Sequence, residues 1–212
     1  MKIRPLRSLG IFTKYPYPGR VKTRLIPVLG EAESARIHRI LTERTCRLAS
    51  RFARKEPVDL SVCFTGGDEI LMRNWLGTGF SYVEQSGDDL GARMEGAFHD
   101  RFARGFRSVV IIGTDCPDLS VLILKEAFDA LGRADVVLGP AADGGYYLIG
   151  LRDGIPDLFH EIDWGTVIVL SQTKRKILRL GLRCIELEML HDIDRPEDIA
   201  RYPDLLTGME VD

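Results

Sequence analysis

Three cationic side chains, Arg20, Lys22 and Arg24, stand at every second position in the stretch YPYPGRVKTRL, which runs from Tyr15 to Leu25. The two prolines of this stretch exclude a continuing helix, because proline fixes its own φ and disfavours helical backbone in the residue before it. If the stretch is extended, the three side chains share one face and repel one another unless an anion lies opposite. Arginine matches the geometry of phosphate oxygens and lysine supplies a point charge, so the spacing favours a polyphosphate ligand. The alternative is a surface network of salt bridges with nearby acids, which would add little stability.

Acidic side chains follow two of the apolar runs of the sequence. Asp115 comes shortly after SVVII, and Asp192 and Asp194 follow RCIEL. A lone carboxylate at the end of a buried strand is costly unless it is paired or bound to a metal. Carboxylate oxygens are ligands that hard cations such as Mg²⁺ and Mn²⁺ prefer. The alternative is that Asp115 and the neighbouring Asp118 only cap the next helix and stabilise a turn.

Two further segments, GDDLGARM and PAADGGYY, combine aspartates with glycines. Asp89 and Gly91 stand where a loop enters a predicted helix, and such a helix start suits an anion or a closely approaching ligand. Gly144 and Gly145 would let a substrate approach the backbone while Asp143 meets a hydroxyl group. The alternatives are an ordinary capped helix start for the first segment and a simple turn for the second.

Apolar runs and helical patterns alternate along the chain. The strands and helices that they predict must position the residues described above. The predicted strands are residues 8–14, 58–64, 80–85, 108–112, 135–139, 146–151 and 183–187, and the predicted helices are 31–54, 68–76, 89–104, 120–131, 166–180 and a short one opening at Pro196. This alternation predicts an α/β fold, a three-layer sandwich around a mainly parallel sheet. The adjoining strands around Gly144 predict one antiparallel departure. With no linker or repeat, we expect a single domain over residues 1–212.

The amino-acid composition and net charge argue against nucleic-acid-binding and membrane-spanning proteins. The 212 residues carry a net charge of −2 and are 45% apolar, which fits a protein with a substantial core and no general affinity for nucleic acid. We expect no membrane span and no signal peptide, and therefore a cytoplasmic protein whose four scattered cysteines are buried as small hydrophobes. The sequence lacks the P-loop, the dinucleotide-binding glycine pattern, the G-x-S-x-G elbow and H-E-x-x-H.

Six segments carry a resemblance to a known family: KYPYPGRVKTRL, GDDLGARM, GTDCPDL, PAADGGYYLIGL, IDWGT and HDIDRPEDI. In this order, over about Leu9–Ile199, they resemble a bacterial family of GT-A-like transferases that is sometimes assigned to arsenosugar biosynthesis. The chain is similar, more distantly, to molybdenum-cofactor and phospholactate guanylyltransferases. The resemblance implies the nucleotide-diphospho-sugar transferase fold, also called GT-A-like.

The resemblance also implies residue roles in binding. Lys22 and Arg24 would hold the nucleotide phosphates, and Lys14 and Arg20 on the same stretch, with Asp89, Gly91 and Trp164, complete the candidate substrate contacts. Trp164 could stack on a sugar or a base, although a tryptophan is more often part of the core. Gly144 and Gly145 would face the acceptor together with Asp143.

A metal-binding role is implied for Asp115, with Asp192 or Asp194 completing the site for Mg²⁺ or Mn²⁺. One departure bears on this. Glycosyltransferases of this fold usually carry Asp-x-Asp, whereas Asp115 is followed by Cys116 and Pro117. Arg195 also stands where related sequences tend to have threonine.

The leading hypothesis is a metal-dependent transferase that uses a nucleotide-activated donor, in the first place a nucleotide sugar, and a small-molecule acceptor. Asp143 or Asp163 would be the catalytic base. One rival is a nucleotidyltransferase that uses a nucleoside triphosphate and releases pyrophosphate, because the wider superfamily holds both chemistries. The other rival is a nucleotide-binding module without turnover. The base, the sugar, the acceptor and the oligomeric state stay open.

Overall fold

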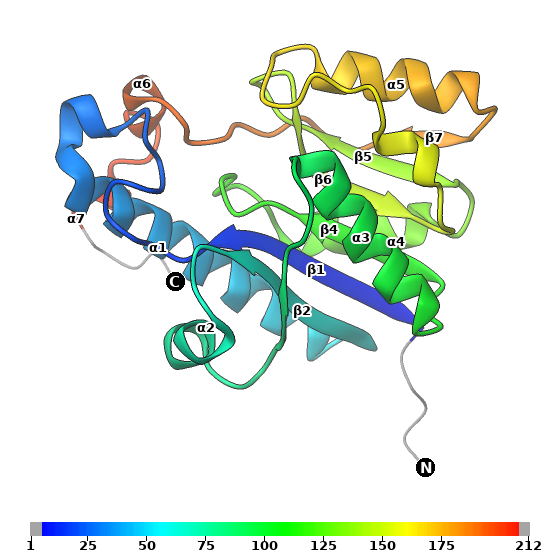
Figure 1. The fold of residues 1–212 in the computed structure, drawn as a ribbon, viewed down its shortest axis with the longest axis horizontal. Helices are drawn as coiled ribbons and strands as arrows, with labels where there is room; N and C mark the ends of the chain where they lie inside the picture. The colour runs from blue at the N-terminus through cyan, green and yellow to red at the C-terminus, as the bar shows by residue number, and fades with distance from the viewer. Residues whose placement is uncertain (1–5, 208–212) are drawn as a thin grey trace.

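The computed structural model describes residues 6–207, in which strands and helices alternate (Figure 1). In chain order the elements are β1 (Arg7–Lys14), α1 (Ile26–Ala53), β2 (Val58–Thr65), α2 (Glu69–Leu76), β3 (Ser81–Glu84), α3 (Leu90–Ala103), β4 (Ser108–Ile112), α4 (Val121–Ala130), β5 (Val136–Pro140), β6 (Tyr146–Leu151), the 3₁₀ helix η1 (Pro156–Phe159), α5 (Val169–Arg179), β7 (Cys184–Glu186), α6 (Pro196–Ile199) and α7 (Asp204–Thr207). The alternation expected from the sequence is confirmed. The expected domain range of 1–212 includes both chain ends, which lie outside the described residues.

Within residues 6–207, seven strands form one mixed sheet in the order β3–β2–β1–β4–β6–β5–β7. β6 runs antiparallel to both of its neighbours, β4 and β5, and the other neighbouring pairs are parallel. The turn between β5 and β6 is short, and a short turn can join antiparallel strands only, because parallel strands need a crossover. The predicted mainly parallel sheet with an antiparallel departure around Gly144 is therefore confirmed.

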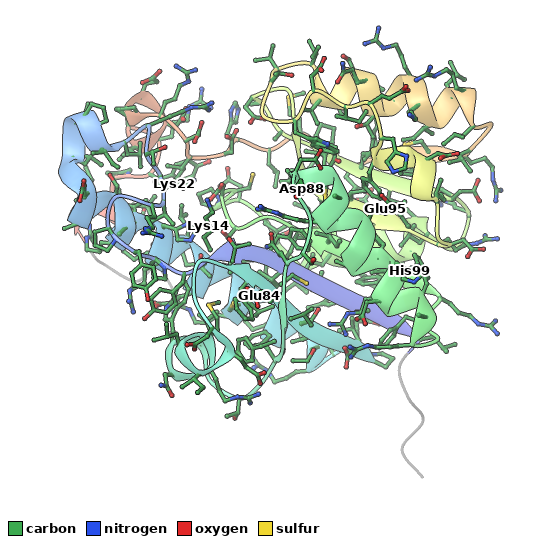
Figure 2. All side chains as sticks on the ribbon, in the orientation of Figure 1. Lys14, Lys22, Glu84, Asp88, Glu95 and His99 are labelled. Atoms are coloured by element: carbon green, nitrogen blue, oxygen red, sulfur yellow. The ribbon has the colours of Figure 1, made fainter. Side chains whose placement is uncertain are left out.

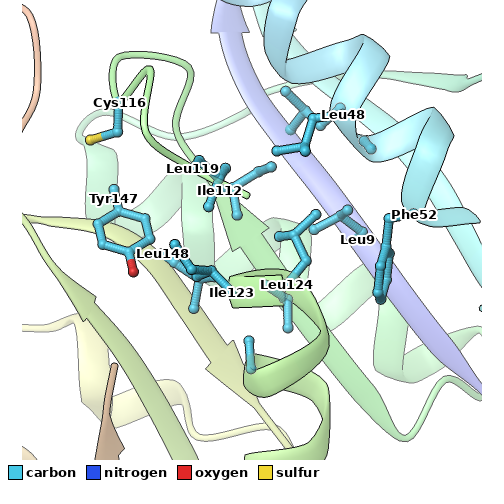
Figure 3. Packing of buried hydrophobic residues seen from close by; sticks show 14 of the residues in the cluster. Leu9, Leu48, Phe52, Ile112, Cys116, Leu119, Ile123, Leu124, Tyr147 and Leu148 are labelled. Atoms are coloured by element: carbon cyan, nitrogen blue, oxygen red, sulfur yellow. The ribbon is translucent and has the colours of Figure 1, made fainter. Parts of the chain in front are cut away.

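Helices cover both faces of the sheet, and successive residues of each central strand point to opposite faces. On β4, Val110 packs in the core beneath α1 and α4, whereas Val109 packs in the core beneath α3. Figure 1 shows α3 and α1 on opposite sides of the sheet. In the first core the rings of Phe52 and Phe128 stack with their centroids 5.7 Å apart, and Figure 3 shows Phe52 beside Leu9.

A third, smaller core joins the loop after β1 to the C-terminal segment. Its buried members are Leu25, Ile37, Leu41, Ile193, Ile199 and Leu205. Because these side chains come from the loop, from α1 and from the segment around α6 and α7, their packing holds residues 15–25 and 190–195 against each other. This core positions the site described below.

The first helix begins earlier than predicted. Residues 26–29 already form a helical turn, with proline in its first turn, and Gly30 then departs from helical geometry at φ 78° and ψ 167° before the helix resumes. Glycine adopts a positive φ without the steric cost that other residues incur, so the kink falls at this position. The helix predicted from residue 31 onward is confirmed, and the kinked turn of residues 26–29 is an addition to it.

The sequence predicts no membrane span and buried cysteines. None of the helices within residues 6–207 is both long and apolar enough to cross a membrane. All four cysteines are free thiols; Cys46, Cys63 and Cys116 are buried, as expected, whereas Cys184 is partly exposed. Burial raises the pKa of the Cys46 thiol to about 12 and that of Cys63 to about 11, so both stay protonated at neutral pH.

Candidate functional site

The carboxyl ends of β1, β4 and β5 lie along one edge of the sheet, where ligands collect in open α/β folds. The segment between β7 and α6 crosses this edge. The Leu190 amide donates to the carbonyl of Pro140, the last residue of β5 (3.0 Å), and the Ile193 amide donates to the Asp115 carbonyl beyond β4 (2.9 Å). These backbone bonds tie together the loops that carry the candidate acids.

The cationic loop is folded into turns and is not extended, so its three cations do not share one face. Lys22 has a left-handed backbone (φ 47°), and its side chain turns inward and is only 4% exposed. The Lys22 ammonium lies 2.7 Å from Asp115 Oδ1 and also donates to the Ile193 carbonyl. Arg24 pairs with Asp194 near the surface. The extended geometry is thus wrong, because the turns send each cation in its own direction.

Arg20 and Lys14 stay exposed at this edge. Figure 2 shows Lys14 and Lys22 near the end of β1. This edge therefore offers two cations already paired with acids, Lys22 and Arg24, and two exposed cations, Lys14 at the end of β1 and Arg20 in the loop. The alternative reading of the sequence, salt bridges with nearby acids, describes the contacts that Lys22 and Arg24 make here.

The acids of this edge have unequal electrostatic environments. Burial would raise the pKa of Asp115, but the adjacent Lys22 ammonium outweighs it and holds that pKa below its ordinary value. Burial, then the charge of Asp143, raises the pKa of Asp192. The pKa of Arg24 is raised by its hydrogen bond to Asp194 and by the charges of Asp194, Asp143 and Asp192. These couplings place Asp115, Asp143, Asp192 and Asp194 in one electrostatic neighbourhood.

The four acids fit a hard cation by donor type, since carboxylate oxygens suit Mg²⁺ and Mn²⁺. Across residues 6–207, however, no group of three or more histidine, cysteine, aspartate or glutamate side chains converges as a metal site. Asp115 and Asp194 are each turned toward a cation of the loop. The ligands implied by the resemblance are therefore gathered at one edge but are not preformed into a coordination shell.

The alternative role of Asp115 and Asp118 as caps of the following helix is wrong. α4 is capped by Ser120, whose Oγ accepts from the Ile123 amide at 3.2 Å. Asp118 instead accepts from the Tyr202 hydroxyl at 2.5 Å. Asp115 is free of any capping duty and faces the cationic loop.

The turn between β5 and β6 carries Asp143, Gly144 and Gly145. Asp143 Oδ1 accepts from the Gly145 amide at 2.8 Å, which closes the turn and leaves the side chain exposed. Gly144 has φ 91°, and a Cβ there would lie 2.1 Å from the Val167 carbonyl oxygen. Its own carbonyl accepts from the Leu170 amide at 2.9 Å. Gly144 is therefore required for packing against the start of α5, whatever binds beyond it.

Three other candidate residues have structural partners. Asp89 caps α3, with Oδ1 accepting from the Ala92 amide at 2.8 Å. A Cβ on Gly91 would lie 2.5 Å from Trp164 Nε1, so glycine is needed for the indole to pack there. Trp164 also makes an edge contact with Tyr146, with ring centroids 6.4 Å apart, and packs against the core beneath α3. Figure 2 shows Asp88 at the adjacent start of α3.

Asp163 is exposed and bound to α5. Its Oδ2 accepts from Gln172 Nε2 at 2.7 Å, and its amide donates to Gln172 Oε1 at 2.8 Å. This reciprocal pair fixes the loop before α5. Of the two candidate bases, Asp143 is the one whose charge couples to the Arg24 and Asp192 side chains.

His38 is a buried member of this edge that the sequence reading did not select. It lies on α1, and its Nε2 is 2.9 Å from the Lys14 carbonyl oxygen and 3.4 Å from Thr13 Oγ1, which in turn is 3.1 Å from Thr42 Oγ1. Burial lowers the pKa of His38 despite the opposing charge of Asp115. A signal was available, since His38 and Thr42 are one helical turn apart beside apolar Ile37 and Leu41.

Residues 48–166, more than half of the chain, match the family described as "Uncharacterized protein conserved in bacteria (DUF2064)". The chain belongs to the DUF2064 family. No protein with a curated description matches it. The matched region of this DUF2064 protein spans β4, β5 and β6 and therefore includes Asp115 and Asp143.

Solved structures share the fold of this DUF2064 protein. A protein of Desulfovibrio desulfuricans G20, provisionally named a nucleotide-diphospho-sugar transferase, is 33% identical with a TM-score of 0.86, covering 94% of this chain and 88% of its own. The 4-diphosphocytidyl-2C-methyl-D-erythritol synthase of Anaerococcus prevotii is 13% identical (TM-score 0.61; 95% and 96% covered). The glucosyl-3-phosphoglycerate synthase of Mycobacterium tuberculosis, solved with Mn²⁺ and UDP, is 12% identical (TM-score 0.56; 96% and 79% covered). The nucleotide-diphospho-sugar transferase fold is thereby confirmed.

Proposed function

We propose that this protein is a transferase that uses a nucleotide-activated donor. The observation that carries the proposal is the meeting of Lys22 with Asp115, and of Arg24 with Asp194, at the carboxyl edge of a sheet with this fold. Cations on one loop and acids on two others suit a ligand that carries phosphates together with a divalent cation. The 33% identical structure is named as such a transferase, which supports the same assignment.

In this proposal Lys22 and Arg24 bind the donor phosphates, and Lys14 at the end of β1 and Arg20 of the same loop are the exposed cations beside them. Asp115, Asp192 and Asp194 would hold Mg²⁺ or Mn²⁺, which supplies positive charge beside the phosphates when bound. Prepositioned positive charge is usually the largest catalytic contribution when negative charge develops on a departing group. Asp143, exposed and next to the same acids, is the proposed base that takes the proton of an acceptor hydroxyl.

Glycosyl transfer from a nucleotide sugar is the first candidate reaction. Nucleotidyl transfer is the second, and it is favoured by the structural likeness to a cytidylyl-transfer enzyme and by the lack of Asp-x-Asp at Asp115. Released nucleoside diphosphate would identify the first reaction, and released pyrophosphate the second. Tight nucleotide binding without product across a broad acceptor panel would instead indicate a binding module. A place in arsenosugar biosynthesis, implied by the sequence resemblance, is the part of the proposal that acceptor identity would test.

The proposal is tested by thermal unfolding with nucleotides and nucleotide sugars, each with and without Mn²⁺. A ligand at a hundredfold excess over its Kd stabilises by about 2.7 kcal/mol, which corresponds to a Tm increase of about 5–10 °C for a domain of this size. We expect such a shift in the wild type with Mn²⁺ present, and its loss in Lys22→Ala/Arg24→Ala.

The matched control is Arg104→Ala/Lys125→Ala, which removes two cations from exposed helical ion pairs elsewhere on the surface. It should keep the full shift. A shift that survives in Lys22→Ala/Arg24→Ala would show that these residues do not bind the phosphates.

A further inference from the structure

Both cations at the centre of the site are already engaged by the acids that the proposed function assigns to a metal. Lys22 contacts Asp115 Oδ1 at 2.7 Å and the Ile193 carbonyl, and Arg24 contacts Asp194. The same groups would be the ligands of the phosphates and of the divalent cation. Two of the proposed phosphate ligands and two of the proposed metal ligands are therefore paired with each other in this arrangement.

Resting on the proposed function, we propose that Lys22 and Asp115 exchange partners when ligands bind: Lys22 passes from Asp115 to a phosphate as Asp115 passes from Lys22 to a divalent cation. Arg24 and Asp194 make the corresponding exchange nearer the surface. The consequence is that donor nucleotide and metal bind weakly one at a time and strongly together.

The burial of Lys22 is the physical reason for this coupling. Its side chain is 4% exposed, so its ammonium is largely desolvated and depends on its anionic partner. A divalent cation arriving alone at Asp115 would compete with this ammonium for the carboxylate and weaken its counter-charge. A phosphate arriving alone would draw the ammonium away and leave Asp115 facing the new anion. When both arrive, each charge exchanges one partner of opposite sign for another.

The remaining acids strengthen the coupling. Among the described residues, neither Asp143 nor Asp192 forms an ion pair, and the charge of Asp143 raises the pKa of Asp192. The negative charge of these two acids, which no ion pair neutralises directly, repels a phosphate that arrives without a cation. It also attracts a divalent cation, but the Lys22 ammonium occupies the neighbouring face of Asp115.

Two variants test the two halves of the exchange separately. Lys22→Met removes the competing ammonium, so its Kd for Mn²⁺ alone, measured by electron paramagnetic resonance of free Mn²⁺, should fall by about tenfold relative to the wild type. Asp115→Asn releases Lys22, so its Kd for UDP or inorganic pyrophosphate in EDTA, measured by calorimetry, should fall by a similar factor. In the wild type, saturating pyrophosphate should lower the Kd for Mn²⁺ beyond what the Mn²⁺–pyrophosphate complex in solution accounts for.

Folding is checked by circular dichroism, and Lys22→Gln replaces Lys22→Met if the latter is unfolded. The control is Lys125→Met, which breaks the exposed ion pair between Lys125 and Asp129 on α4. It should change neither Kd. A Kd for Mn²⁺ that is unchanged or higher in Lys22→Met and Lys22→Gln overturns the exchange, even where the wild type binds nucleotide. If the wild type binds neither pyrophosphate nor any nucleotide with Mn²⁺ present, the proposed function fails, and the exchange fails with it.

Discussion

At the residue scale, several glycines and acids at the sheet edge are fixed by their neighbours before any ligand is considered. Gly144 is the clearest case. Its φ of 91° and the Val167 carbonyl, 2.1 Å from the position of an added Cβ, both demand glycine. The turn that presents Asp143 is consequently tied to the start of α5, so the orientation of that acid depends on a contact made by its neighbour.

The Gly144 contact predicts a pair of unequal substitutions. Gly165 has a similar φ of 78° but nothing within 4 Å of an added Cβ. Gly165→Ala should therefore lower the free energy of unfolding by about 1–2 kcal/mol through backbone strain alone. Gly144→Ala should cost about 1–3 kcal/mol more, because the methyl group must also displace the Val167 backbone. Urea denaturation of both variants measures the difference, and equal losses would refute the packing requirement.

At the element scale, α1 contacts the end of β1 at the point where the cationic loop begins. Its buried polar residues His38 and Thr42 meet Thr13 and the Lys14 carbonyl, where β1 ends and the cationic loop begins. Because a carbonyl oxygen can only accept, His38 Nε2–H donates this hydrogen bond to the Lys14 carbonyl. The helix thus sets the direction in which the loop leaves the sheet. That direction in turn decides how the Lys22 side chain reaches Asp115.

This arrangement predicts that His38 can be replaced by another donor at the same position. In His38→Gln, Nε2 of glutamine can donate to the Lys14 carbonyl, so stability and the nucleotide-induced Tm shift should be largely kept. In His38→Leu the partly buried Lys14 carbonyl loses this donor, which should cost about 0.5–1.5 kcal/mol and reduce the shift.

Both His38 variants are compared by urea denaturation and by the same thermal-shift measurement. The difference between them separates hydrogen bonding from packing, since glutamine and leucine both fill the space. If glutamine and leucine reduced the ligand-induced shift equally, His38 would have no role in positioning the loop.

At the scale of the whole molecule, the site depends on two segments far apart in sequence. The third core buries Leu25 from the loop against Ile193, whose own backbone bonds to Asp115 and Lys22. The C-terminal segment is in this way part of the binding edge. Truncating a side chain of this core should therefore weaken ligand binding at the site. An equally destabilising truncation in another core should not.

The test compares two buried isoleucines. Ile193→Ala and Ile177→Ala each remove a side chain that is 0–2% exposed, and each should cost about 2–5 kcal/mol of unfolding free energy. Ile193→Ala should also raise the Kd for the nucleotide measured well below Tm, whereas Ile177→Ala, in the core beneath α3, should leave that Kd unchanged. Equal Kd values in the two variants would mean that the third core does not support the site.

Most of the fold could be predicted from the sequence, because its signals are local. Alternating strand and helix periodicities, the Ser120 cap and the short turn at Gly144 each act over a few residues, and together they specify a mainly parallel α/β sheet. The kink at Gly30 could not be placed by periodicity, since one helical turn on either side of a glycine carries too little pattern.

The sequence by itself also determined which residue types gather near the strand ends: cations after the first strand, acids after the fourth and last. Only the tertiary structure decided which of them touch. The separation of Lys22 from Asp115 and Ile193 along the chain gives no hint of their contact, which arises because the third core folds the C-terminal segment back across the sheet edge. Side-chain pairing of this kind depends on burial and on the direction of each turn, and neither is a local property of the chain.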